Sequence, residues 1–254
     1  MKKLIVSGDS CTELAFESIC HPTWDFSWPK WPEHLAKHLG MELVCLAKGG
    51  QGNDFIYSTL QDEIIKTPKE EIGLVIAAWT QCHRKDWQEG WYSTWNSLRV
   101  DQNGDLLNMI KKSMRNLISF QTLCERYNLP YMHFQMGNLF ENMYNGLKPT
   151  EKDLFLGRVA KGNLVPYDVI RTKEKDLEEM SNIIDSYKPL INNHMNWPFS
   201  VYLDGENMLD IMNPNDQNIL LKVSELDAHP NEKGHKALAD ELIKRMDKHG
   251  INNL

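Results

Sequence analysis

The chain has 254 residues, of which 41% are hydrophobic, and its formal net charge at pH 7 is -7. This length suits one α/β domain with a large core. The negative charge argues against nucleic acid or an anionic membrane surface as the main partner.

The N-terminus carries no signal peptide that we can identify. Lys2 and Lys3 precede an apolar run of a few residues, which stops at Ser7. No stretch approaches the length of a transmembrane helix. The five cysteines are odd in number and show neither a Cys-x-x-Cys pair nor a zinc pattern. We therefore expect reduced thiols and a cytoplasmic location.

Apolar runs that suit buried strands alternate with segments that suit helices. The expected strands are 4–6, 42–46, 74–78 and 130–135, with 201–203 as a candidate fifth. The expected helices are 32–39, 53–65, 109–127 and 232–249, and a further helix can start within 11–20. Alternation of this kind predicts a mostly parallel sheet with helices on both faces. We expect one three-layer α/β/α, flavodoxin-like domain over residues 1–254, with a helical insertion at 137–214 before the last helix.

A short polar motif, Gly8-Asp9-Ser10, directly follows the first expected strand. Gly8 allows a sharp turn there, so the hydroxyl of Ser10 would project from the carboxyl edge of the sheet. Ligands bind at that edge in open α/β sheets. The alternative is an ordinary turn closed by the Asp9 side chain.

A second motif, Asp227-Ala228-His229-Pro230, lies just before the last expected helix. A serine nucleophile needs a base, and the base needs an acid to orient it, so His229 and Asp227 are candidates for these roles. The alternative is a turn that only caps the helix. We prefer the catalytic interpretation because two independent placements agree.

Together these motifs resemble the SGNH hydrolases, also called the GDSL esterase/lipase family. Gly8-Asp9-Ser10 is similar to the family's first block, residues 47–53 to its second, and Asp227-Ala228-His229-Pro230 to its last. Residues 31–40 also resemble a stretch that many members carry before the second strand. The resemblance covers residues 1–135 and 225–252, whereas residues 137–214 have no counterpart that we can assign.

The resemblance implies a role for each matching residue. Ser10 would be the nucleophile, His229 the general base and Asp227 its orienting acid. The backbone N–H groups of Ser10 and Gly50 would form the oxyanion hole, because preorganised donors stabilise the charge that develops in acyl transfer. Such a mechanism requires no cofactor. For Gly50 the alternative is a plain loop glycine.

Two features depart from the family pattern. Its third block normally supplies an asparagine after the third strand, but residues 77–84 contain none. Thr80 is the closest positional match, and Asn53 or Gln81 is another candidate for the missing oxyanion donor. The last block reads Asp-x-His where most members have Asp-x-x-His, so the backbone must turn differently for Asp227 to reach the imidazole.

An aromatic-rich stretch, residues 79–95, follows the third strand and so also lies at the ligand edge. Flat aromatic faces suit sugar rings, and an arginine suits an anionic group. The alternative is a packed loop or a protein interface. Our candidate substrate-binding residues are Asp9, Trp79, Gln81, His83 and Arg84.

The remaining histidines show no metal-ligand spacing, so we expect no metal site, and His133 reads as a core histidine. We therefore predict a serine esterase for a small-molecule or carbohydrate ester, with acetate as the first guess at the acyl group. The alternative is a non-catalytic, carbohydrate-binding or structural protein of the same fold. A nucleotide-binding α/β protein ranks lower, because residues 49–53 lack a Walker Lys-Ser pair and a GxGxxG pattern.

Overall fold

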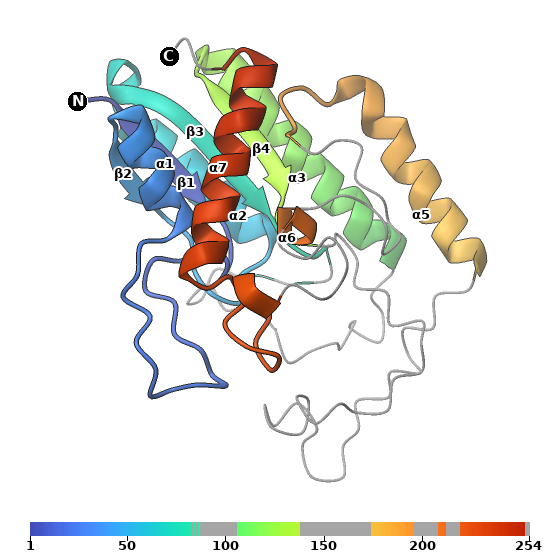
Figure 1. The fold of residues 1–254 in the computed structure, drawn as a ribbon. Helices are drawn as coiled ribbons and strands as arrows, with labels where there is room; N and C mark the ends of the chain where they lie inside the picture. Colours follow the sequence, from blue (N-terminus) through green and yellow to red (C-terminus); the bar gives the residue numbers. More distant parts are fainter. Residues whose placement is uncertain are drawn as a thin grey trace.

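The structure is a computed structural model and describes residues 1–82, 84, 86, 106–137, 174–195, 208–211 and 219–251. A four-stranded sheet in the order β2-β1-β3-β4 forms its centre (Figure 1). The strands are β1 (Lys3–Ser7), β2 (Glu42–Cys45), β3 (Ile72–Trp79) and β4 (Tyr131–Gln135). Every neighbouring pair is parallel. The predicted α/β class and parallel sheet are confirmed.

Helices cover both faces of this sheet. One face carries α1 (Trp31–Leu39) and α7 (Glu232–His249), which pack against each other (Figure 1). The other carries α2 (Asn53–Lys66) and α3 (Leu106–Tyr127), with α5 (Glu174–Tyr187) against α3. Short helical turns complete the described elements: η1 (Lys69–Glu71), η3 (Lys188–Leu190), α6 (Met208–Ile211) and η4 (Ile219–Leu221).

Strand residues alternate between the two cores, as the period of a strand requires. Ile5 and Val75 contribute to the core beneath α2 and α3. Leu4 and Leu74 contribute to the core beneath α1 and α7. Because both faces are covered, the interiors of the strands are mostly apolar, which is why their sequences contain short hydrophobic runs.

Four expected strands and four expected helices occur within a few residues of their predicted bounds. The helix start proposed within residues 11–20 is wrong, because the structure has turns there. Side chains in this segment bind the distant loop before α7 instead: Ser18 Oγ donates to the Asp227 carboxylate, and Cys20 Sγ contacts Leu226 O at 3.3 Å. These long-range contacts favour an irregular backbone over a local helix.

Part of the predicted insertion is built into the core. Ile184 of α5 is buried in the core beside α3. After this helix the chain runs beside β4, where Asn193 O accepts from His133 N at 3.1 Å and Met195 N donates to His133 O at 2.8 Å. The candidate strand 201–203 lies outside the described residues, and the single-domain assignment stays a prediction. No helix among the described residues is long and apolar enough to cross a membrane.

Candidate active site

Ser10 lies in a tight turn directly after β1. The Asp9 carbonyl oxygen accepts from Thr12 N and Glu13 N, and its carboxylate oxygen Oδ1 accepts from Cys11 N at 3.0 Å. Any side chain at Gly8 would collide with Thr12, so the turn requires glycine there. The turn closed by the Asp9 side chain and the half-buried Ser10 directly after it therefore occur together, so the two interpretations of this motif do not exclude each other.

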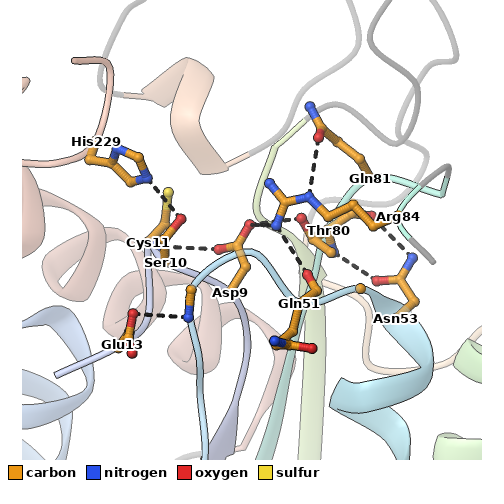
Figure 2. A network of polar contacts seen from close by, with 12 residues as sticks. Asp9, Ser10, Cys11, Glu13, Gln51, Asn53, Thr80, Gln81, Arg84 and His229 are labelled. Atoms are coloured by element: carbon orange, nitrogen blue, oxygen red, sulfur yellow. Dashed lines mark hydrogen bonds and ion pairs between the residues drawn. The ribbon is translucent and has the colours of Figure 1, made fainter. Parts of the chain in front are cut away.

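Ser10, His229 and Asp227 form one continuous chain of hydrogen bonds. Ser10 Oγ lies 2.7 Å from His229 Nε2, as Figure 2 shows, and His229 Nδ1 lies 2.5 Å from Asp227 Oδ1. Both distances are within hydrogen-bond reach. A carboxylate only accepts hydrogen bonds, so Nδ1 carries the proton and the lone pair of Nε2 faces the Ser10 hydroxyl. That geometry allows the imidazole to take the serine proton.

The short Asp-x-His spacing is accommodated by a tight backbone turn. Asp227 Oδ1 accepts from His229 N at 3.0 Å as well as from the ring. The other carboxylate oxygen accepts from Ser18 Oγ. Burial raises the pKa of Asp227, but these bonds from His229 and Ser18 outweigh it and hold that pKa below its usual range. The carboxylate thus stays charged and keeps orienting the ring.

The segment between β1 and α1 also contacts the loop that carries His229. The ring of Phe16 stacks at a tilt on the imidazole of His229, with the ring centroids 4.4 Å apart. His21 Nε2 and Ser224 Oγ lie 2.6 Å apart. These contacts fix the position of His229 relative to the Ser10 turn.

We call residues 49–52 the glycine turn; it joins β2 to α2. Gly50 has φ +76°, a conformation that favours glycine. Gly49 N donates to Glu13 Oε2 at 2.9 Å, and a Cβ placed on Gly49 would lie 3.6 Å from Ser10 Cβ. Burial raises the pKa of Glu13, and the bond from Gly49 only partly offsets this. The turn that contains Gly50 thus lies beside the candidate nucleophile.

Asn53 and Thr80 hold the start of α2 to the end of β3. Thr80 N donates to Asn53 Oδ1 at 2.9 Å, and Asn53 Nδ2 donates to Thr80 O and to Ser113 Oγ, both at 3.1 Å. Thr80 Oγ1 donates to Asp9 Oδ2 at 2.7 Å. The hydrogen bonds of both side chains hold the loop together, so this arrangement gives no support to either as an oxyanion donor.

Arg84 and Asp9, two candidate substrate-binding residues, bind each other. Arg84 Nη1 lies 3.0 Å from Asp9 Oδ2, and both side chains are less than a tenth exposed. Arg84 Nε also donates to Oε1 of Gln81, a third candidate substrate-binding residue, at 3.3 Å. These groups form an internal network, visible in Figure 2, and contact with substrate stays a prediction for them.

Trp79 does not line the site, which corrects our expectation. It is fully buried, and its Nε1 donates to His133 Nδ1 at 3.0 Å. The reason is strand alternation: as the last residue of β3, Trp79 faces the core beneath α2 and α3. His83 and the aromatic residues at 87–95 lie outside the described residues.

His133 is a core histidine, as predicted. It is fully buried, and burial lowers its pKa to about 4. Among the described residues no group of His, Cys, Asp and Glu side chains is arranged to hold a metal ion.

Sequence reasoning missed several residues that build the site, namely Glu13, Phe16, Ser18 and Asp86. No local motif marks them. Their contacts join segments that are far apart in the sequence, so only the fold brings them to Ser10 and His229.

Comparisons with known proteins agree on the fold. No protein-family model matches the sequence, and no curated protein matches it. Among 35 matching solved chains is TesA, at 12% identity and a TM-score of 0.50, covering 97% of this chain and 99% of TesA. A Bacillus subtilis protein matches at 12% identity and a TM-score of 0.51, covering 100% of this chain but 58% of that one.

Further matches carry GDSL-family or SGNH-hydrolase names. The chain shares its α/β fold with TesA and with the Bacillus subtilis protein. Identities of 9–13% carry the fold alone, so the chemistry must be argued from this chain's own residues.

Proposed function

We propose that this protein is a serine hydrolase that cleaves esters, with Ser10 as nucleophile, His229 as general base and Asp227 as the acid that orients it. The observation that carries the proposal is the hydrogen-bond chain from Ser10 Oγ through the His229 ring to the Asp227 carboxylate. Nucleophile, base and orienting acid each lie within reach of the next, which is the geometry that acyl transfer by serine requires.

The reaction follows from this geometry. Ser10 Oγ attacks the ester carbonyl carbon while His229 Nε2 takes the hydroxyl proton. The backbone N–H groups of Ser10 and Gly50 stabilise the negative oxygen of the tetrahedral intermediate. His229 then gives the proton to the departing alcohol, which leaves an acyl group on Ser10. Water, activated by His229, hydrolyses that acyl ester and restores the serine.

We propose a small-molecule ester as substrate, with a small acyl group such as acetate. The proposal that the alcohol part of the ester is a carbohydrate rests on the aromatic-rich stretch after β3. Trp79 is withdrawn from that argument because it is buried. The carbohydrate proposal therefore depends on residues 83–95, most of which lie outside the described part of the chain.

A fluorophosphonate probe tests the proposal directly, because it labels activated serine nucleophiles covalently. We expect the parent protein to be labelled at Ser10, and Ser10→Ala to lose both the label and the hydrolysis of p-nitrophenyl acetate. Ser186→Ala is the matched control, since that exposed hydroxyl lies on α5 and donates to Ile183 O. Circular dichroism checks that each variant folds. A label that persists in Ser10→Ala would contradict the assignment of the nucleophile.

A non-catalytic protein of the same fold is the second candidate. One observation favours it: the Asn53 amide and the Thr80 hydroxyl, our candidates for the missing third donor, are engaged in other hydrogen bonds. If the parent protein is neither labelled by the probe nor active on p-nitrophenyl acetate, this second candidate becomes the better one.

A further inference from the structure

We propose that Arg84 and Asp86, from the segment after β3, are positioning residues that fix the glycine turn and thereby the backbone donor at Gly50. This inference rests on the proposed function, because it explains how an oxyanion hole is held rigid without the family's third-block asparagine.

Arg84 links the turn of the nucleophile to the glycine turn. Its Nη1 donates to Asp9 Oδ2 and to Gln51 O, both at 3.0 Å. Asp9 is the residue before Ser10, and Gln51 is the residue after Gly50. One guanidinium group therefore sets the spacing between the two backbone segments that carry the proposed oxyanion donors. The Arg84 and Asp9 side chains are 7% and 6% exposed, so water screens their ion pair little.

Asp86 binds the other end of the glycine turn. Its Oδ1 accepts from Gly52 N at 2.7 Å, and its Oδ2 accepts from Phe55 N at 3.0 Å. Gly52 is the N-cap of α2 and has no side chain with which to cap the helix. Asp86 supplies that cap from a distant segment, and its negative charge suits the positive end of the helix dipole.

The space around Gly52 shows that the two segments are packed directly on each other. A Cβ on Gly52 would lie 2.9 Å from both Arg84 Cβ and Arg84 O, and 2.8 Å from Asp86 Oδ2. Real Cβ atoms do not approach other atoms this closely. Glycine at this position therefore allows Arg84 and Asp86 to reach the turn.

The turn is also held from the opposite side, where Gly49 N donates to Glu13 Oε2 at 2.9 Å. Each described neighbour of Gly50 within the turn, namely Gly49, Gln51 and Gly52, is thus bound by an ionisable side chain. Figure 2 shows the contact between Arg84 and Gln51. Gly50 lies between them at φ +76°. Oxyanion donors act best when their direction is fixed before the reaction, and these anchors fix it.

The test compares Arg84→Met, which removes the cation, with Arg84→Lys, which keeps it. We expect kcat for p-nitrophenyl acetate to fall about a hundredfold in Arg84→Met with KM little changed, because misplacing a donor by about 1 Å costs rate and not ground-state binding. We expect Arg84→Lys to recover part of that loss. Affinity for a boronic acid, whose adduct with Ser10 places an oxygen in the oxyanion hole, should fall in parallel with kcat.

Arg245→Met is the matched control, because Arg245 also pairs with a carboxylate and donates to a backbone carbonyl, but lies on α7. It should keep the parent kcat. Asp86→Asn tests the second positioning residue and changes the side chain less than Arg84→Met does. It therefore replaces Arg84→Met as the test if that variant does not fold. We expect its kcat to fall at least tenfold with a parent-like KM.

The outcomes separate this inference from the proposed function. A parent protein that the fluorophosphonate probe labels at Ser10, together with folded Arg84→Met and Asp86→Asn variants that keep the parent kcat and boronate affinity, overturns the positioning role alone. A parent protein that is not labelled overturns the proposed function and this inference with it.

Discussion

Asp227 binds the ring and the backbone of His229 through the same carboxylate oxygen. This explains how the Asp-x-His spacing, one residue shorter than the common family pattern, still orients the imidazole. Sequence position was sufficient to single out Ser10, His229 and Asp227 as residues that lie together, because each is beside a strand end or helix start with a recognisable pattern. Their catalytic roles stay a proposal. Ser18 was not predictable, because a serine in a turn becomes a partner of Asp227 only once the fold brings the two segments together.

At this scale we predict that Asp227→Asn lowers kcat on the order of 10³- to 10⁴-fold. An amide can donate to Nδ1 and thereby favour the tautomer whose Nε2 carries the proton, which cannot accept the Ser10 proton. Steady-state hydrolysis of p-nitrophenyl acetate measures the loss. Asp240→Asn, at an exposed ion pair with Lys236, is the control and should keep the parent rate. A parent-like rate in Asp227→Asn would mean that another group orients His229.

Ser18→Ala gives a second, smaller prediction. It removes the hydrogen bond to the buried Asp227 carboxylate, and bonds to charged groups contribute about 1.5–3 kcal/mol. We expect a fall in kcat of about tenfold or more, with partial recovery in Ser18→Thr, which keeps the hydroxyl. If Ser18→Ala and Ser18→Thr lose equal activity, the hydroxyl is not what Asp227 needs.

Elements with a strong local pattern were predictable, and elements shaped by distant contacts were not. The strand β3 is buried at every position and reads as apolar throughout, so its prediction succeeded. The segment 11–20 looked able to start a helix, but its polar side chains bind the loop before α7. The prediction that Trp79 binds substrate was wrong for a related reason: a position at a strand end does not tell which face of the sheet a side chain occupies.

The helix α7 follows His229 closely, so the contacts of its first turn also secure the loop that carries His229. Asn231 Oδ1 accepts from Gly234 N at 3.0 Å as the cap of α7, and its Nδ2 donates to Leu220 O and Lys222 O at 2.9 and 2.8 Å. We predict that Asn231→Ala lowers the free energy of unfolding by about 1–2 kcal/mol, the upper part of the range for lost caps.

Urea denaturation measures that change. Lys236→Ala, which breaks an exposed ion pair on the same helix, is the control and should change the free energy of unfolding by no more than about 0.5 kcal/mol. Equal stabilities of Asn231→Ala and the parent would show that water replaces all of these hydrogen bonds without cost.

In the whole molecule, the order of the strands gathers the site at one edge. β1 lies between β2 and β3, and all run parallel. The described residues that follow them therefore emerge side by side: the Ser10 turn after β1, the glycine turn after β2, and Thr80, Arg84 and Asp86 after β3. The packing of α1 against α7 brings His229 to the same edge. The alternating pattern of strands and helices predicted this edge, whereas the ion pair of Asp9 with Arg84 depends on side-chain packing that the pattern does not contain.

Buried histidines give the whole molecule a stability that depends on pH. Burial lowers the pKa of His133 to about 4 and of His235 to about 3, and it also lowers that of His194. His133 Nδ1 accepts from Trp79 Nε1, and His235 Nδ1 accepts from Trp31 N, so both rings are held neutral. In the unfolded chain an imidazole takes up a proton near pH 6.5. Below that pH the unfolded chain therefore binds more protons than the folded protein does.

We predict that the free energy of unfolding is highest above about pH 6.5 and falls as the pH drops toward about 4, by up to about 1.4 kcal/mol per pH unit for each buried histidine. His133→Gln isolates one of them, because the amide offers an acceptor toward Trp79 and a donor toward Asn192 O, the partners of the present ring. Its free energy of unfolding should be lower than the parent's at pH 7.5, and the difference should shrink steadily at pH 6 and pH 5. Urea denaturation at each pH measures this. A difference that stays constant across the series would mean that the pKa of His133 is the same in the folded protein and in the unfolded chain, which contradicts the prediction.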